Sequence, residues 1–368
     1  MRNLKLLSLI ALLATLMLII TACGGGASGP TEEGATGEGS DTESGERIDV
    51  NASGSSFIAP LFTKMFDEYN TANEGVRVNY QSTGSGTGIS QLIEGTVDFA
   101  ASDAPMNSEE LDKMGEEVLH IPMAIAPVAI ALNIEGLEGN LNLSPEVLAD
   151  IFLGEITNWN DPAIAEINEG VELSDQAIAV VHRSDGSGTT FIFSEYLTAV
   201  DQGWADAVGT GKSLDWPVGI GAKGSEGVSG QVGQIPGSIG YVEVSYALQN
   251  DMSVANIQNQ EGEFIAPSLE SASAAAAGAV PTLPEDLIFS MVDMPGEGTY
   301  PIAGTTWALV PQELGAAVGV AKAEKIKELL TWANSEGQQY APDLTYAPLP
   351  KEMQELNQTQ IDKINTAE

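Results

Sequence analysis

The sequence predicts an α/β fold built from many short elements. Segments that alternate between apolar and polar residues, as strands do, precede segments with apolar residues at helical spacing, and this order is typical of α/β proteins. The chain also has 40 glycines and 18 prolines but only 6% aromatic residues, which indicates frequent turns. With 368 residues, 43% of them hydrophobic, it is long enough for two globular units.

Residues 1–22 have the pattern of a secretory signal peptide. Arg2 and Lys5 precede an apolar run, Leu6 to Ile20, that is shorter than the roughly 20 residues of a membrane-spanning helix. Small residues then precede Cys23, the only cysteine of the chain, as in a bacterial lipobox. We therefore expect cleavage before Cys23 and a lipid anchor on its thiol. The alternative is an ordinary secretory signal followed by a buried thiol.

The sequence is strongly acidic, and part of the excess lies in a predicted flexible tether over residues 23–47. This segment is rich in Gly, Ser, Thr and Glu and lacks hydrophobic periodicity. Over the whole chain, 52 Asp+Glu against 14 Lys+Arg give a formal net charge of -38. The excess argues against nucleic acid and anionic lipid surfaces as partners, because like charges repel.

The first expected elements follow the tether in strand–loop–helix order. Apolar residues at helical spacing predict a helix over 59–70, and they are Leu61, Phe62, Met65, Phe66 and Tyr69. Strands are expected within 47–57, over 76–81 and over 97–102, and further helices from residues 89 and 108.

The next segment, from Ile121 to Ile134, is apolar for more than ten residues, which is too long for one surface strand. We expect a strand that passes from one domain into another. Ser144 as N-cap and Pro145 in the first turn predict a helix over 144–156. The remaining expected elements are strands over 177–183 and 299–311, a strand with a helical continuation over 238–248, and helices over 190–200, 271–279 and, closing the chain, 320–335.

Four loops that follow strands and precede helices carry the candidate functional residues. They are Ser55-Ser56-Phe57, Gly84-Ser85-Gly86, Ser102-Asp103 and Asp185-Gly186-Ser187-Gly188-Thr189. In open α/β sheets such loops meet at the ligand crevice. The free N–H groups and positive dipole end of a helix start can hold an oxyanion, and hydroxyl side chains add donors. The loops together predict an anion site in spite of the negative net charge, although each loop alone is also compatible with a tight turn.

Arg183 supplies the guanidinium nearest to these loops in the sequence, and it is one of only two arginines after residue 47. Asp185 is expected to hold the planar guanidinium group of Arg183 in an orientation that faces an anion. The alternative is a surface ion pair within a turn.

Neither nucleophilic catalysis nor metal binding is favoured by the pattern. Ser187 lies outside a G-x-S-x-G elbow, and only His120 and His182 could act as its base. His182 precedes Arg183 in an alternating strand and should face away from it. Since there is no Cys or His cluster and the acids are dispersed, no metal or other cofactor is expected.

Six segments together resemble, in order and spacing, the periplasmic or lipid-anchored phosphate-binding proteins of phosphate-specific ABC transporters. These segments are GSSFIAP, YQSTGSGTGISQLIEGTVDFAASDAP, LADIFLGEITNWNDPAI, VVHRSDGSGTTF, WPVGIGAKGSEGV and PGSIGYVE. The resemblance covers roughly residues 48–350 and implies a bilobed, periplasmic-binding-protein-like fold. Residues 48–122 and 299–368 would form lobe I and residues 123–298 lobe II, with hinge strands near 121–126 and 298–303.

The resemblance also implies a function without catalysis. Inorganic phosphate would bind in the cleft between the lobes and pass to two permease subunits driven by a cytoplasmic ATPase. The protein would sit, lipid-anchored, on the extracytoplasmic face of the cell membrane. Two alternatives stay open: a secreted phosphatase-like enzyme on the same fold, and a surface lipoprotein that senses phosphate.

The ligand contacts implied by the resemblance are Ser56, Phe57, Ser85, Asp103, Arg183, Ser187, Gly188 and Thr189. Asp103 would be the one acceptor among donors, and it would accept a hydrogen bond from protonated phosphate but repel sulfate. On its own, Asp103 could equally be a cap for the following helix. The sequence departs from the family pattern at Ser56, where threonine is common, and at Ile58, where proline is common, and neither change removes a donor.

Overall fold

The structure, a computed structural model, describes residues 47–137 and 139–368. The predicted signal peptide, Cys23 and the tether up to residue 46 lie outside the described residues. Within the described part of the chain, no helix has the length and apolar character needed to cross a bilayer.

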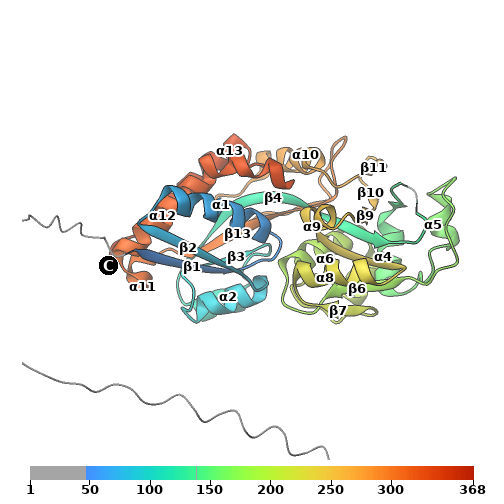
Figure 1. The fold of residues 1–368 in the computed structure, drawn as a ribbon, viewed down its shortest axis with the longest axis horizontal. Helices are drawn as coiled ribbons and strands as arrows, with labels where there is room; N and C mark the ends of the chain where they lie inside the picture. Colours follow the sequence, from blue (N-terminus) through green and yellow to red (C-terminus); the bar gives the residue numbers. More distant parts are fainter. Residues whose placement is uncertain (1–46, 138) are drawn as a thin grey trace, which may run out of the picture. The chain divides into compact units, whose positions relative to one another are not determined.

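A ten-stranded mixed sheet organises the described residues (Figure 1). Its main path is β2-β1-β3-β13-β4-β8-β6-β7, with β12 paired to β13 and β9 to β4, and a second sheet has the order β11-β10-β5. The strands are β1 Ile48–Gly54, β2 Val76–Ser82, β3 Phe99–Ser102, β4 Val118–Asn133, β5 Asn142–Leu143, β6 Ala179–Arg183, β7 Ile220–Ala222, β8 Ser238–Glu243, β9 Ser253–Val254, β10 Asn256–Gln258, β11 Phe264–Ile265, β12 Met291–Val292 and β13 Ile302–Pro311.

The long strand β4 joins the two halves of the main sheet. Its residues 118–127 pair antiparallel with β13, and its residues 128–133 pair antiparallel with β8. All of its residues except Asn133 are buried, and so are all ten residues of β13. Burial on both faces explains the continuous apolar run in the sequence. The predictions of one long strand over the apolar run 121–134 and of a strand over 299–311 are therefore confirmed.

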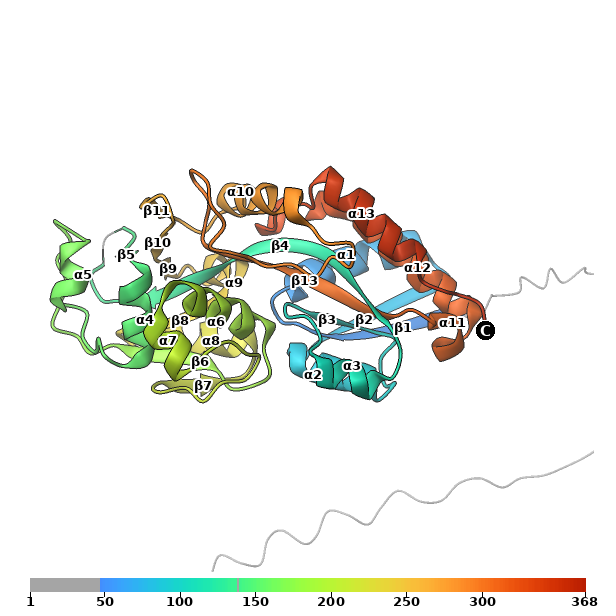
Figure 2. The same ribbon diagram turned by 180° about the vertical axis from the view of Figure 1, so that it is seen from behind.

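Helices cover both faces of each half of the sheet (Figures 1 and 2). On the β1 side, α1 and α12 cover one face and α2 the other, whereas α6 and α8 pack on the β8 side. The helices are α1 Ala59–Ala72, α2 Ser85–Ile93, α3 Ser108–Met114, α4 Pro145–Leu153, α5 Pro162–Glu166, α6 Gly188–Val200, α7 Gln202–Ala207, α8 Gly224–Gln234, α9 Val244–Gln249, α10 Leu269–Ala279, α11 Leu314–Val318, α12 Val320–Asn334 and α13 Lys351–Asp362, with 3-10 turns η1 Val280–Thr282, η2 Glu336–Tyr340 and η3 Pro342–Leu344.

Two helices begin earlier than their apolar pattern predicts. Helix α2 starts at Ser85 rather than residue 89, and α6 starts at Gly188 rather than residue 190. Gly, Ser and Thr fill these first turns. Because such residues have weak helix propensity, the sequence pattern there predicts a loop. As a result, the candidate residues Ser85, Gly188 and Thr189 lie in first helical turns rather than in loops.

The prediction that the helix over 320–335 closes the chain is wrong, because α13 follows it. Only part of the buried face of α13 is apolar, since Asn357 and Gln360 are buried beside Met353 and Ile361. The Asn357 side-chain amide donates to the carbonyl of Pro122 on β4 (2.6 Å). A polar contact to a distant strand therefore replaces the apolar stripe that would have revealed this helix.

Candidate functional site

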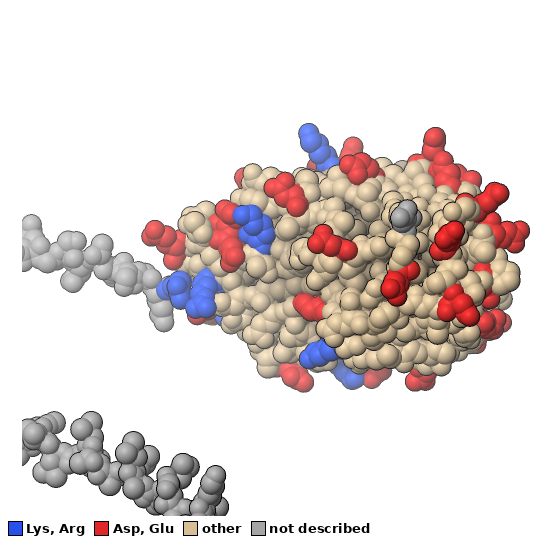
Figure 3. All heavy atoms as spheres, turned by 45° about the vertical axis from the view of Figure 1, so that its right-hand side comes forward, with Lys and Arg blue, Asp and Glu red and all other residues tan. Residues whose placement is uncertain are grey.

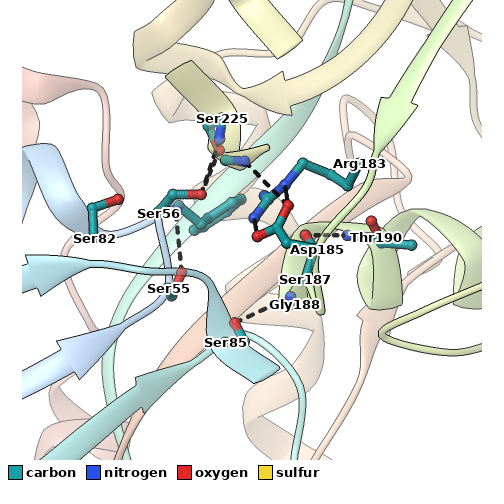
Figure 4. Close-up of polar contacts among 12 residues, drawn as sticks. Ser55, Ser56, Ser82, Ser85, Arg183, Asp185, Ser187, Gly188, Thr190 and Ser225 are labelled. Atoms are coloured by element: carbon teal, nitrogen blue, oxygen red, sulfur yellow. Dashed lines mark hydrogen bonds and ion pairs between the residues drawn. The ribbon is translucent and has the colours of Figure 1, made fainter. Parts of the chain in front are cut away.

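The ends of four strands bring the predicted loops together. Strands β1, β2 and β3 are parallel, so the loops after Gly54, Ser82 and Ser102 meet at one edge of the sheet. The loop after β6 approaches them from the other half of the sheet (Figure 4). The amide of Gly86 donates to the carbonyl of Gly186 (2.9 Å), so the two halves are in direct contact here.

The first turn of α6 lies against Asp103. The Gly188 amide donates to Ser85 Oγ (3.1 Å), and a Cβ at position 188 would lie 2.6 Å from the amide nitrogen of Asp103. Only glycine therefore permits this approach. Ser187 is the N-cap of α6, with its Oγ accepting from the Thr190 amide (3.1 Å). The neighbouring Thr189 Oγ1 is buried and has no hydrogen-bond partner among the described residues.

Arg183 and Asp185 form a two-point ion pair. Arg183 Nε donates to Asp185 Oδ1 (2.8 Å) and Nη2 to Oδ2 (2.6 Å), and the Arg183 side chain is only 2% exposed. The amide of Gly224 also donates to Asp185 Oδ1 (3.1 Å). Burial opposes ionisation of Asp185, but the hydrogen bond and charge of Arg183 outweigh it and lower the pKa of this carboxyl. The pair is buried, so the alternative of a surface ion pair is wrong.

Asp103 is the buried carboxylate of the site. Its Oδ1 accepts from Ser55 Oγ (2.5 Å) and from Thr306 Oγ1 on β13 (2.6 Å). Its Oδ2 is buried and has no hydrogen-bond partner in the described part of the chain. Burial raises the pKa of Asp103 to about 6, against the effect of the Ser55, Thr306 and Ser85 hydroxyls and of the Arg183 charge.

The alternative role of Asp103, as a cap for the following helix, is not what the structure contains. The N-cap of α3 is Asn107, whose side chain accepts from the Glu110 amide (2.9 Å) in a capping box. Asp103 instead accepts hydroxyl hydrogen bonds from Ser55, directly after β1, and from Thr306, in the middle of β13.

The first loop holds Ser56 and Phe57 in different surroundings. Ser56 Oγ accepts from the Ser225 amide (3.1 Å) and lies 3.0 Å from Ser225 Oγ. The Phe57 amide donates to Ser55 Oγ (3.0 Å), and its ring packs edge-on against Tyr346. Donation from the Phe57 amide to a ligand stays a prediction.

Two site residues, and the role of a third, were not predicted. Ser225 lies in the first turn of α8, and its Gly-Ser helix start has the same character as the four loops, so that signal was present in the sequence. Ser55 belongs to the first predicted loop, but its contact with Asp103 was not predicted. Thr306 lies on β13, 203 residues from Asp103, and no local pattern marks it.

The structure does not assemble a base for Ser187. The His182 ring stacks on Trp216 with centroids 4.7 Å apart, and its Nδ1 lies 2.9 Å from the Arg183 carbonyl oxygen. His120 accepts the Met106 amide through Nε2 (3.2 Å). Both histidines of the described residues are therefore engaged elsewhere.

A two-part α/β sheet with polar loops meeting between its parts defines a binding protein of the PBP superfamily. The family model described as "PBP superfamily domain" matches residues 31–336. Among solved structures, a high affinity periplasmic phosphate-binding protein bound with phosphate has a TM-score of 0.68 at 22% identity, covering 84% of this chain and 92% of that one. A phosphate-binding protein from Stenotrophomonas maltophilia has a TM-score of 0.66 at 22% identity, covering 85% and 94%. These structures support the fold alone.

Curated sequences define the family more closely. A phosphate-binding protein PstS from Xylella fastidiosa (strain Temecula1) is 44% identical, covering 84% of this chain and 83% of its own length. PstS proteins from Pasteurella multocida and Methanocaldococcus jannaschii are 43% and 33% identical, covering 84% and 98% of this chain and 89% and 96% of their own lengths. The chain belongs to the PstS family of phosphate-binding proteins, which are binding proteins rather than enzymes.

Proposed function

We propose that this protein binds inorganic phosphate where the four loops meet and delivers it to an ABC importer. The observation that carries the proposal is the environment of Asp103. A buried carboxylate with one unpartnered oxygen lies beside a helix start and near a buried guanidinium. Such an arrangement suits an anion that also carries a proton to donate.

The donors surround this carboxylate. Ser56, Ser85 and Thr189 contribute hydroxyls. Gly188 lies at a helix start, where the dipole favours an anion, and its amide would exchange Ser85 Oγ for the ligand. The Ser187 hydroxyl accepts from Thr190 yet keeps its own proton to donate. Arg183, held by Asp185, contributes the positive charge. These local dipoles and one cation explain how a chain with a net charge of -38 attracts an anion.

Asp103 makes the site selective in this proposal. Its pKa of about 6 leaves it ionised at neutral pH. Phosphate keeps at least one proton under these conditions and can donate it to the carboxylate, whereas sulfate has none. Sulfate would leave a buried carboxylate facing like charge, and a site built for a hydrogen bond can reject an analogue that lacks it by roughly 10⁴-fold.

The two predicted lobes should close on the ligand, because the proposed phosphate contacts come from both lobes. Residues 48–122 and 299–368 would move against residues 123–298, with bending near 121–126 and 298–303. Phosphate touches loops from both lobes in this proposal, so it favours the closed arrangement.

The anchor and the partners complete the proposed function. Lipidation of Cys23 would hold the protein on the extracytoplasmic face of the membrane, where it would pass phosphate to two permease subunits driven by a cytoplasmic ATPase. Metabolic labelling with palmitate tests the anchor. Label is expected on the wild type and absent from Cys23→Ser, and equal labelling of the two would contradict it.

A calorimetric titration tests the proposed function. The wild type is expected to release or absorb heat with phosphate and not with sulfate. Arg183→Ala should weaken phosphate binding at least ~30-fold, because it leaves Asp185 unpaired and removes the charge of the site. Arg77→Ala is the matched control, since Arg77 is an exposed residue of β2. An absence of heat with the wild type, or equal affinities for Arg183→Ala and the control, would overturn the proposal.

A further inference from the structure

Three consecutive carbonyl groups of the first loop each accept a hydrogen bond from a tyrosine hydroxyl. Tyr80 donates to the Ser55 carbonyl (2.6 Å), Tyr246 to the Ser56 carbonyl (2.7 Å) and Tyr346 to the Phe57 carbonyl (2.5 Å). Tyr246 and Tyr346 are buried, and Tyr80 is partly buried. The tyrosines come from β2, from α9 and from the segment after η3, so three separate parts of the chain converge on one loop.

The geometry of the peptide bond turns these contacts into a constraint on the amides. In a planar trans peptide, the C=O of one residue and the N–H of the next point in opposite directions. Holding the three carbonyls therefore directs the amides of Ser56, Phe57 and Ile58 away from the tyrosines. The Phe57 amide indeed donates to Ser55 Oγ, which itself donates to Asp103 Oδ1. The N–H side of the loop thus faces the carboxylate of the site.

The residue before the loop, Gly54, is held in a backbone conformation that side chains rarely permit, and contacts within the loop must offset the entropy lost on ordering this glycine. Gly54 has φ +137°, and a Cβ there would lie 2.0 Å from the carbonyl oxygen of Ala101. Glycine loses more conformational freedom on ordering than any other residue. If a peptide of the loop turned over, its carbonyl oxygen would face the anion and repel it.

We propose that the hydroxyls of Tyr80, Tyr246 and Tyr346 are positioning groups of the anion site. They hold the peptide dipoles of residues 55–57 with their amide ends toward the anion, and they raise its affinity without touching it. This inference rests on the proposed function, because it takes inorganic phosphate to be the anion.

The Tyr246 contact has a further property, because it joins the two halves of the sheet. Tyr246 lies on α9, directly after β8, whereas the loop directly follows β1. The Ser56–Ser225 contact joins the same loop to α8. Loss of the Tyr246 hydroxyl should therefore increase the rate of phosphate release as well as weaken binding.

The test compares tyrosine-to-phenylalanine variants by phosphate calorimetry. Tyr246→Phe and Tyr346→Phe are each expected to weaken binding about 3- to 10-fold, which corresponds to the net contribution of one hydrogen bond. Tyr300→Phe is the matched control. Its hydroxyl donates to the Val128 carbonyl on β4 (2.9 Å) and it is 0% exposed, so the variant loses the same kind of contact away from the loop. The control should bind phosphate like the wild type.

A spectroscopic measurement separates positioning from general destabilisation. In protein labelled with ¹⁵N at Phe and Ile, phosphate should shift the amide protons of Phe57 and Ile58. Tyr346→Phe should reduce this shift, whereas Tyr300→Phe should preserve it. Peaks are assigned through Phe57→Leu and Ile58→Val.

Each outcome bears on one hypothesis. If the wild type binds phosphate and the Tyr246 and Tyr346 variants match Tyr300→Phe in affinity and amide shifts, the positioning role is overturned while the proposed function stands. Equal losses in all three variants would also overturn it, because the effect would then be one of stability. If the wild type itself gives no heat with phosphate, the proposed function fails first. Thermal unfolding of each variant identifies any that does not fold. If Tyr246→Phe or Tyr346→Phe does not fold, the other of the two is compared with Tyr300→Phe and decides whether the positioning role stands.

Discussion

Asp103 combines strong burial with incomplete hydrogen bonding. It is 1% exposed, two hydroxyls donate to its Oδ1, and its Oδ2 has no partner among the described residues. A buried polar atom without a partner costs free energy in a binding protein unless a ligand completes it. For this reason we propose that Asp103 accepts a hydrogen bond from the proton that phosphate carries.

Asp103→Asn is expected to weaken the exclusion of sulfate. The amide is neutral and can donate, so sulfate would gain a hydrogen bond where the carboxylate repelled it. The ratio of phosphate to sulfate affinity should fall about 100-fold or more in a competition titration. Asp98→Asn is the control, because Asp98 is a buried carboxylate bonded to Lys322 and the Asn51 amide. An unchanged ratio in Asp103→Asn would contradict the assigned role.

Glu243 is a second buried carboxyl group, and it controls stability rather than selectivity. It is 0% exposed, caps α9 through the Ser245 amide (2.9 Å), and its Oε2 lies 3.0 Å from the Tyr346 hydroxyl oxygen. Burial raises its pKa to about 8, despite the hydrogen bonds that favour the charged form. The folded protein therefore keeps a proton on Glu243 that the unfolded chain releases above pH 4.5.

The free energy of unfolding should fall as pH rises from 6.5 to 8. The contribution of Glu243 is complete below the unfolded pKa of 4.5 and is lost as pH rises through about 8, with a slope of up to ~1.4 kcal/mol per pH unit. Asp103, with a pKa of about 6, has lost most of its proton below this window. His120, whose pKa is lowered from 6.5 to about 4 by burial, contributes an opposing slope that fades as the unfolded imidazole loses its proton above pH 6.5. Urea unfolding should show that Glu243→Gln flattens the slope. An equally steep slope in the variant would exclude Glu243 as its source.

At the scale of elements, the site depends on how closely a helix start approaches a strand end. Helix α6 begins at Gly188, whose amide bonds Ser85 Oγ from the opposite half of the sheet. Asp103, at the end of β3, lies against the same glycine. The Asp103 amide nitrogen and Cβ are among the nearest atoms, and rotation of the Asp103 side chain moves neither of them.

Gly188→Ala should therefore separate α6 from β3. The added Cβ would lie 2.6 Å from the Asp103 amide nitrogen, and relief of this overlap should cost about 1–3 kcal/mol of stability and weaken phosphate binding at least ~10-fold. The control is Gly230→Ala in the interior of α8, where nothing lies within 4 Å of the added Cβ. That variant should be neutral or up to ~1 kcal/mol more stable. Equal behaviour of the two variants in calorimetry and thermal unfolding would refute the close approach.

For the molecule as a whole, the net charge and the charge of the phosphate ligand have the same sign. In the face shown in Figure 3, acidic side chains are scattered over much of the surface and basic ones are few. These exposed charges are screened over about 8 Å at physiological ionic strength. The buried site has its own guanidinium and helix dipoles, and these act at hydrogen-bond distance, where screening is weak. The surface acids therefore do not decide what the site binds.

The described residues belong to one compact unit, and the long strand β4 connects its halves by pairing with β13 in one and with β8 in the other. Lys212 Nζ bonds Glu110 Oε2 (2.5 Å) and Ser82 Oγ bonds Glu226 Oε1 (3.0 Å), so further contacts join the halves beside the site. The structure therefore resembles the closed arrangement of the proposed motion.

Phosphate should reduce the radius of gyration in small-angle scattering. In the proposed function the ligand would contact loops from both halves, which would favour the closed arrangement over open ones. Sulfate at the same ionic strength is the control for the wild type, and Arg183→Ala should show no compaction with either anion. If phosphate left the wild-type scattering unchanged while calorimetry reported binding, closure on binding would be refuted.

The sequence by itself determined the local features of this protein. Apolar spacing predicted α1, the unbroken run predicted β4, and Ser144 with Pro145 predicted the start of α4, because these signals depend on residues within one or two turns. The strand-end loops, including Asp103 and Arg183, were also predicted, since the carboxyl ends of parallel strands share an edge. Helix α13 was missed because polar contacts hold part of its buried face.

Only the tertiary structure decided which distant groups complete the site. Thr306, Ser225 and the tyrosines at positions 80, 246 and 346 reach the loops from 25 to 289 residues away along the chain. Periodicity tells which face of an element is buried, but it carries no information about the partner on that face. The pairing of Asp103 with β13 follows from the register of β13 against β3, which the packing of the whole sheet sets.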